Sequence, residues 1–500
     1  MPFAVFAAVF AALVALHWNL LALPFYWDEA GYFVPAALDF FRHGLLIPQS
    51  TLPTGHTPAV TFYLALAWKI FGYSARVTRV AMLVFAAGTI MSLAKLGRLV
   101  VGREAALWAA TLLAVSPLFF AQSSLVQLDL PAALFTTLAL VFLLQGRSKL
   151  FAVTASLAVL SKETAVVLLP VAWAFAYRRR RESTSRGAWF WLAFPALPLA
   201  AWVLYFRLAA GFWLGSSGYL QYNLYSTLRP LHIVTAFARR LYQVCFGGFN
   251  WVLAGAALIA WRWRRKTGRP APSESQKALL EGDFRFLVAG LVAAYVILLS
   301  LLGGAVLARY LLPIFPALYL FFVIEIRRLP RRTALAVTLA SAALFIAAWN
   351  INPLYPFPYE DNLAYATFIR LHERAAHFLE ARPGDPRILT AWPATDELTH
   401  PYLGYVSKPL RVKAVRNFDS GSFRAVRAGS FDLLYLYSRQ WQPRPNWIME
   451  ESCRQNLIAK ALHCVPQIPP NVLAARYKLR ILASWRRGGQ WVKIYAPRNP

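Results

Sequence analysis

Long apolar segments alternate with short polar loops over the first 350 residues. Runs such as Ala105–Phe120, Phe284–Leu302 and Ala334–Trp349 contain few charges and approach the roughly 20 residues that a helix needs to cross a bilayer. Phe3–Leu23 has no basic residues before it and is longer than the apolar core of a typical signal peptide, so we expect it to be retained as the first membrane helix. The pattern predicts a polytopic α-helical membrane protein.

The charges between these segments predict a topology with a cytoplasmic N-terminus and about 11 spans. We expect the short segment Pro58–Phe71, which carries Lys69, to lie at the external interface within a first external loop of about 24–76. After Phe3–Leu23, the predicted spans are 77–96, 105–122, 130–145, 150–161, 164–177, 188–209, 241–260, 284–302, 309–325 and 333–350.

This topology places most of the excess positive charge in the cytoplasm, as the positive-inside rule requires. Arg76, Arg79, Arg239 and Arg240 are the exceptions on the outer side. The cytoplasmic clusters are Lys95/Arg98/Arg103, Arg147/Lys149, Arg178–Arg181, Arg262–Arg269 and Arg327–Arg332.

The overall composition agrees with a membrane protein. Hydrophobic residues make up 58% of the chain and charged residues 15%, whereas about a quarter of the residues of a soluble domain are charged. The net charge of +30 comes from the short basic clusters between apolar runs. It is therefore explained by topology, and we expect no nucleic-acid partner.

The polarity changes near residue 350. Residues 351–500 contain no run long enough to span a bilayer, and the segments Phe431–Tyr437 and Trp491–Tyr495 resemble strands. We therefore predict a transmembrane module, 1–350, followed by a small extracytoplasmic mixed α/β domain. Outside the cytoplasm Cys453 and Cys464 could form a disulfide, whereas Cys245 is typical of a small buried hydrophobe.

Two adjacent acids, Asp28 and Glu29, open the first external loop within the segment Tyr26–Tyr32. One interpretation is that they cap an interfacial helix, Ala30–Arg42, because carboxylates are favourable at a helix N-terminus. The other is that a carboxylate here orients or deprotonates an acceptor, or binds a metal ion.

Another acid, Asp129, is predicted to lie on the same external side, where the next span begins. Pro131 just inside that helix is typical of a helix start, so Asp129 could act as a cap. An acid near the membrane is also a candidate for function.

Two cations are predicted on the external side, where the positive-inside rule makes basic residues uncommon. Lys162, in Ser161–Thr164, and Arg309, which begins Arg309–Pro313, either extend toward lipid headgroups or neutralise a phosphate. Arg239 and Arg240 belong to an expected amphipathic external helix and are weaker candidates.

The order of these residues resembles the GT-C glycosyltransferases, of the type that includes protein O-mannosyltransferases and lipid A aminoarabinose transferases (glycosyltransferase family 39). The resemblance covers residues 1 to about 350. It is carried by Asp28-Glu29 with Tyr32, Gly55-His56-Thr57-Pro58 followed by Phe62-Tyr63, Gly72 and Arg79, Asp129, Ser161-Lys162-Glu163, and Arg309-Tyr310-Leu311.

The resemblance implies an inner-membrane enzyme that moves a sugar from a polyprenyl-phosphate carrier to a glycolipid, glycan or protein acceptor on the extracytoplasmic face. No nucleotide cofactor is expected. The implied catalytic residues are Asp28, Glu29 and Asp129, and the donor-phosphate residues are His56, Lys162 and Arg309, because Thr57 stands where some relatives have Lys. Tyr32 and Tyr310 would bind substrate, and a divalent metal could bridge Asp28 and Asp129.

The alternative from another functional class is a transporter or flippase of lipid-linked sugars. Transporters usually place ionisable groups near the middle of the bilayer. The predicted spans here have few acids at that depth, which favours chemistry at the membrane surface. An O-antigen-type ligase or polymerase would need a large external loop between the later spans, and this chain has none.

Overall fold

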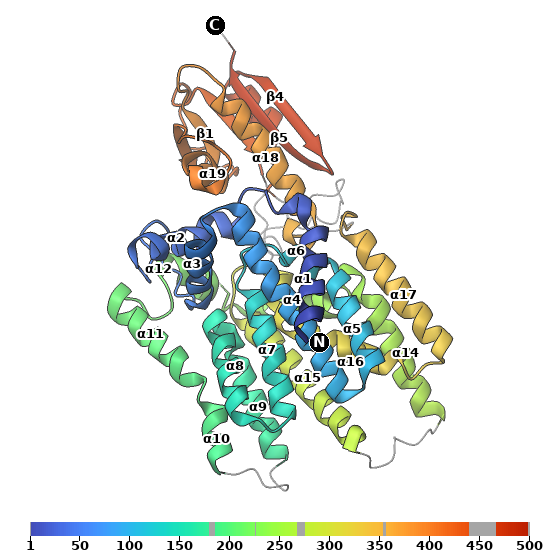
Figure 1. Cartoon of the computed structure of the whole chain (residues 1–500). Coiled ribbons are helices and arrows are strands. Elements are labelled where there is room, and N and C mark those ends of the chain that lie inside the picture. Colours follow the sequence, from blue (N-terminus) through green and yellow to red (C-terminus); the bar gives the residue numbers. More distant parts are fainter. Residues whose placement is uncertain are drawn as a thin grey trace. The chain divides into compact units, whose positions relative to one another are not determined.

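A computed structural model describes residues 2–179, 186–225, 227–267, 276–353, 357–439 and 467–498. The chain forms two compact units (Figure 1). The helical unit comprises Met1–Trp18 and Ala36–Ile351, and the C-terminal unit comprises Asn19–Pro35 and Asn352–Pro500. Part of the first loop, with the first acidic motif, thus folds with the C-terminal residues. Cys453 and Cys464, the predicted disulfide pair, lie outside the described residues.

Helices of very different lengths build the helical unit. Short 3-10 or π-helical turns join several of them, at η3 Glu163–Val167, η5 Gln221–Tyr225, η6 Gly247–Phe249 and η7 Ala308–Ile314, and η1 Trp18–Leu20 follows the first helix. The α-helices are α1 Pro2–Leu16, α2 Val34–His43, α3 Ala59–Phe71, α4 Ala75–Val100, α5 Arg103–Val115, α6 Pro117–Gln122, α7 Asp129–Leu144, α8 Ser148–Ser161, α9 Leu168–Arg178, α10 Arg186–Ala193, α11 Ala196–Ala210, α12 Ser217–Leu220, α13 Pro230–Cys245, α14 Asn250–Thr267, α15 Gln276–Leu301, α16 Phe315–Ile326 and α17 Arg331–Ala348.

The centre of the helical unit is α4, which packs against α5 and α7, while α7 also packs against α8 (Figure 1). Small residues allow the close approach: a Cβ atom on Gly97 would lie 2.7 Å from Cα of Ala106. Small residues at helix contacts are typical of membrane bundles, because lipid gives little hydrophobic drive for helices to associate.

Six helices of the described part of the chain are long and apolar enough to cross a membrane, and four shorter apolar helices accompany them. The protein is therefore a multi-pass helical membrane protein. The count of about 11 spans and their sidedness stay predictions. The six long helices are Ala75–Val100, Gly187–Ala210, Pro230–Arg264, Ala278–Leu301, Ala308–Ile326 and Arg331–Ala348.

Several helices that match predicted spans are interrupted at Pro or Gly. Proline removes a backbone donor and disfavours helical geometry in the residue before it, and glycine adopts positive φ without a steric cost. In addition, α1 ends at Leu16, well before Leu23, and a helix begins at Pro230, well before residue 241. The breaks fall at Ser116–Pro117, Phe194–Pro195 and Gly247–Gly248, and in the 3-10 segment that contains Pro313.

The C-terminal unit contains a five-stranded mixed sheet in the order β2-β1-β3-β5-β4. The central strand β1 runs parallel to β2 and β3, with Ile388 paired to both Val412 and Leu433, and β5 is antiparallel to β3 and β4. This confirms the predicted mixed α/β fold and its two strand-like segments. The strands are β1 Ile388–Ala391, β2 Val412–Val415, β3 Leu433–Tyr437, β4 Leu479–Arg487 and β5 Gln490–Pro497.

Helices complete the core of this unit. All five residues of β3 are buried, and α18 packs against β4 and β5. The buried ring of His372 on α18 lies 2.6 Å from the carboxylate of Glu397 on α19. The helical segments are η2 Glu29–Phe33, η8 Tyr359–Asp361, α18 Ala364–Glu380, α19 Ala394–Thr399, η9 Pro401–Leu403 and α22 Pro470–Arg476.

Candidate active site

The first acidic motif lies at the start of the π-helix η2 in the C-terminal unit. Asp28 occupies the N-cap position, but its carboxylate makes no capping hydrogen bond. Instead, the buried carboxylate of Glu29 accepts a hydrogen bond of 2.7 Å from the backbone N–H of Tyr26. Glu29 therefore shapes the loop, and the half-buried Asp28 is the better candidate for chemistry. Tyr32, on the same π-helix, is also half-buried.

The second acid meets a lysine at one end of a helical hairpin in the helical unit. Asp129 is the first residue of α7 and Lys162 follows the last residue of α8, so packing of these consecutive helices brings both residues to the same end. Nζ of Lys162 lies 2.5 Å from Oδ1 of Asp129, and both side chains are buried. The Asp129 carboxylate is thus the counter-ion of Lys162, because a buried charge needs a partner.

Further cations surround this ion pair. Nη1 of Arg309 lies 3.8 Å from Oδ2 of Asp129. The ring of Tyr310 is contacted by three cations: Nζ of Lys162 lies 4.0 Å from its centroid, and the guanidinium carbons of Arg309 and Arg240 lie 5.2 and 5.5 Å from it. We call this group the cation cluster; its members are Asp129, Lys162, Arg240, Arg309 and Tyr310. Its three cations and single carboxylate suit an anionic ligand such as a phosphate.

Arg240 connects the cluster to α13. Its Nη1 atom donates to Oε1 of Gln243 at 3.0 Å and to the carbonyl oxygen of Leu307 at 2.5 Å. Nε2 of Gln243 donates to the carbonyl oxygen of Val306 at 2.9 Å. These bonds hold the segment before η7 against α13, and so position Arg309 and Tyr310 at the start of η7.

His56 contacts Glu163, which follows Lys162 of the cation cluster in the sequence. Nδ1 of His56 is 3.1 Å from Oε1 of Glu163, the residue after Lys162, and Nε2 is 3.3 Å from the hydroxyl of Tyr219. Burial alone would raise the pKa of Glu163, but the neighbouring His56 and Lys162 outweigh it and lower this pKa to about 2. Glu163 is therefore ionised at neutral pH and can hold the His56 ring in place.

The loop that carries His56 has a conformation suited to glycine. Gly55 has a φ of +76°, and a Cβ atom there would lie 2.8 Å from the carbonyl carbon of Leu214. The carbonyl oxygen of Gly55 accepts a hydrogen bond of 3.0 Å from the indole of Trp202. The loop is therefore fixed against α11 and the segment after it.

Comparison with known proteins shows what the part of the chain around this site is similar to. The sequence profile of a family described as dolichyl-phosphate-mannose-protein mannosyltransferase matches residues 55–206, a range that contains His56, Asp129 and Lys162. This match confirms the resemblance predicted from the sequence. Residues 55–206 of the chain are therefore similar to a family of glycosyltransferases. A search of curated protein sequences found no match.

The fold of the chain is similar to that of ArnT from Cupriavidus metallidurans. The crystal structure bound to undecaprenyl phosphate has a TM-score of 0.56 at 14% identity and covers 98% of this chain and 97% of that chain. The apo crystal structure has a TM-score of 0.54 at 13% identity, with the same coverage. At these identities the likeness establishes a shared fold.

The structure brings together four residues singled out from the sequence, namely Asp129, Lys162, Arg309 and Tyr310. His56 belongs to the same unit and contacts Glu163, which is adjacent to Lys162. Asp28, Glu29 and Tyr32 lie in the C-terminal unit. Their roles in catalysis remain predictions.

Arg240 was predicted on an amphipathic external helix and ranked as a weaker candidate. Its side chain is completely buried, whereas Arg239 is exposed. The spacing along α13 indicates that Arg240 is buried. It follows His232 and Ala236 at intervals of four and precedes Val244 by four, and these residues share the buried face of the helix.

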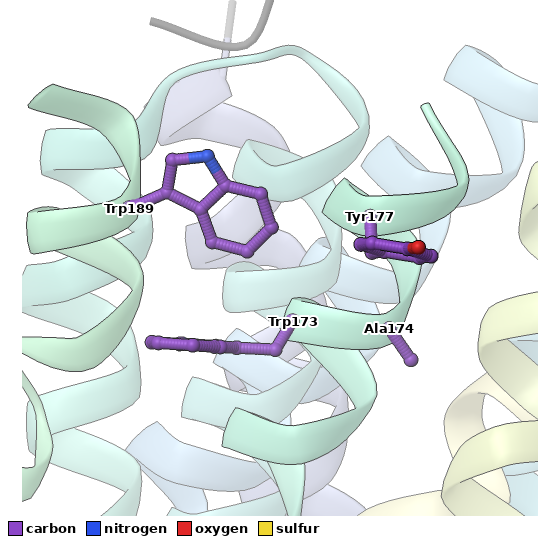
Figure 2. Close-up of a pocket in the computed structure, with 4 residues that line it drawn as sticks. All are labelled: Trp173, Ala174, Tyr177 and Trp189. Atoms are coloured by element: carbon purple, nitrogen blue, oxygen red, sulfur yellow. The ribbon is translucent and has the colours of Figure 1, made fainter. Parts of the chain in front are cut away.

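Part of the helical unit distinct from these residues forms an open hollow of about 520 Å³. Figure 2 shows its lining: Trp173, Ala174 and Tyr177 from α9, and Trp189 from α10. The two indole rings pack edge to face at 5.3 Å. Aromatic residues at the ends of apolar helices are typical of the membrane interface. We assign the hollow no chemistry.

Within the described ranges, no three His, Cys, Asp or Glu side chains are grouped so that they could hold a metal ion. Asp28 and Asp129 belong to different units. A divalent metal that bridges these two carboxylates therefore stays a prediction.

Proposed function

We propose that this protein transfers a hexose or pentose from a polyprenyl-monophosphate carrier to a glycolipid, glycan or protein acceptor on the extracytoplasmic face. The observation that carries the proposal is the cation cluster, in which Lys162, Arg240 and Arg309 surround Tyr310. These three cations outnumber the Asp129 carboxylate and the adjacent Glu163 carboxylate. The undecaprenyl phosphate bound to ArnT, a protein of the same fold, supports a lipid phosphate as the ligand.

The cation cluster would stabilise the leaving group. In the reaction an acceptor oxygen forms a bond to the anomeric carbon while the bond from that carbon to the phosphate oxygen breaks. The donor phosphodiester carries one negative charge, and the lipid phosphate that leaves gains a second. Lys162, Arg309 and Arg240 become more favourable partners as this charge develops, which lowers the barrier.

The acceptor hydroxyl must lose its proton when it attacks. We assign the proton to the carboxylate of Asp28, which is half-buried, whereas the neighbouring Glu29 is buried. Glu29 would hold the loop, and Tyr32 would contact the substrate. If the acceptor is itself a phosphate, its oxygen is already ionised and Asp28 would only position it.

Radiolabel transfer tests the proposal. The purified protein in lipid nanodiscs would be mixed with undecaprenyl-phosphate-linked hexoses and pentoses and with a bacterial membrane fraction as acceptor. Labelled product that depends on Lys162 is the expected result. Movement of labelled donor across a sealed vesicle without any product would instead support the transporter alternative.

Arg240 and Arg239 form a matched pair for testing the phosphate site. Arg240→Gln should weaken binding of undecaprenyl phosphate by about tenfold or more, because a hydrogen bond to a charged group contributes about 1.5–3 kcal/mol. Arg239→Gln, at the exposed neighbouring position, should leave the affinity unchanged. Quenching of tryptophan fluorescence during titration with undecaprenyl phosphate measures both.

Arg240→Lys separates the effect of the positive charge from the effect of the guanidinium's hydrogen bonds to Gln243 and Leu307. If the positive charge alone matters, this variant retains most of the affinity. Equal affinities for the wild type, Arg240→Gln and Arg239→Gln would exclude Arg240 from the phosphate site.

A further inference from the structure

The residue before Asp28 has an unusual backbone conformation. Trp27 has a φ of +46°, in the left-handed region that bulky residues rarely adopt. Such a conformation costs about 1–3 kcal/mol and persists only where the surrounding structure enforces it. The contacts of Trp27 therefore determine how Asp28 is presented.

Aromatic side chains from the C-terminal residues enclose Trp27. Its ring lies 5.0 Å from that of Trp392, at an interplanar angle of 73°, and 5.8 Å from that of Phe368 on α18, at 69°. The guanidinium of Arg439 lies 5.9 Å from the centre of the Trp27 ring. Edge-to-face packing of this kind fixes ring orientation as well as position.

Trp392 also touches the chain after Asp28. A Cβ atom on Gly31 would lie 2.9 Å from Cζ2 of Trp392, so the indole lies directly against the backbone of η2. Nε1 of the same indole donates a 3.0 Å hydrogen bond to Oδ2 of Asp396, which fixes the ring. Trp392 thus contacts the chain on both sides of Asp28, at residues 27 and 31.

The chain before the motif is held by the same unit. The backbone N–H of Phe25 donates to the carbonyl oxygen of Leu403 at 3.1 Å, and the hydroxyl of Tyr405 donates to the carbonyl oxygen of Phe25 at 3.1 Å. The ring of Tyr26 packs at 5.5 Å against Phe368. These contacts leave the loop little freedom to move away from Trp392.

We propose that Trp392 is a positioning residue for the transfer reaction: through Trp27 and Gly31 it sets the orientation of the Asp28 carboxylate. The C-terminal unit is then required for the chemical step. This inference rests on the proposed function, in which Asp28 accepts the acceptor proton. A small displacement of a catalytic group costs orders of magnitude in rate, so loss of the indole should slow the chemical step.

The test compares Trp392→Ala, Trp392→Phe and Gly31→Ala in the full-length protein in nanodiscs. Labelled undecaprenyl-phosphate sugar is the donor and the membrane fraction is the acceptor. Trp392→Ala should lower the transfer rate at saturating donor by about 10- to 100-fold with an unchanged KM for the donor. Trp392→Phe should restore part of that rate. Gly31→Ala, which pushes the indole away without removing it, should reproduce the loss.

Trp485 provides the matched control. It lies on β4 of the same unit and packs against Phe378 at 5.5 Å, so Trp485→Ala also removes a packed indole. Trp485→Ala should leave the transfer rate unchanged. A purely structural role for Trp392 would lower the melting temperature of Trp392→Ala without lowering the rate of the folded fraction.

Three outcomes separate this inference from the proposed function. If Trp392→Phe and Gly31→Ala transfer at the wild-type rate while Asp28→Asn is inactive, the inference is overturned and the proposed function stands. If Trp392→Ala does not fold, the other two variants decide. If the wild type itself transfers no sugar from any donor, the proposed function fails, and the role of Trp392 fails with it.

Discussion

Replacing Asp28 with Asn should reduce sugar transfer to a hydroxyl acceptor by about 10²–10⁴-fold, the usual contribution of a general base. Asparagine has nearly the same shape as aspartate but cannot accept the acceptor proton. A loss of transfer in a variant that stays folded would separate this role from a purely structural one. Radiolabel transfer and a thermal melt of the same nanodisc sample measure activity and folding.

Two further carboxylates serve as controls for Asp28. Glu29→Gln should lower the melting temperature, because a neutral acceptor holds the Tyr26 N–H less strongly than the buried carboxylate does. Asp385→Asn, at an exposed position of the same unit, should change neither stability nor transfer. Wild-type transfer by Asp28→Asn would mean that Asp28 does not act as a base, as expected if the acceptor is a phosphate.

Replacing Lys162 with Met should abolish detectable transfer and also destabilise the protein by about 3–5 kcal/mol. The variant loses a cation from the phosphate site. It also leaves Asp129 buried without its partner at 2.5 Å, and an uncompensated buried charge is expensive. Transfer assays and unfolding monitored by tryptophan fluorescence would follow the two losses separately.

A double variant distinguishes the stability effect from the chemical effect. Asp129→Asn combined with Lys162→Met removes both charges, so stability should largely recover while transfer stays absent. Recovery of transfer together with stability would show that the Lys162–Asp129 pair serves only the fold. Lys162→Arg, which keeps the charge, should retain partial activity.

The sequence by itself predicted the fold class of the protein and singled out four residues that meet in its cation cluster. Runs of apolar residues, which bilayers require, predicted the multi-pass helical fold, and alternating strand-like segments predicted β3 and β5 in a separate mixed unit. The charge pattern predicted Asp129 and Lys162 on one side of the membrane. In the structure, the short connection between α7 and α8 keeps these two helix ends together. That local constraint also makes them contact.

Only the tertiary structure decided which polar residues are buried and what they contact. It gave Glu29 and Asp28, adjacent acids of similar chemistry, different environments, and it brought Arg240 to Tyr310 from a helix some 70 residues earlier. It also grouped the first acidic motif with Trp392 in the C-terminal unit. A periodic pattern records which face of a segment is buried. The partner on that face depends on contacts between segments far apart in the sequence, which no local pattern contains.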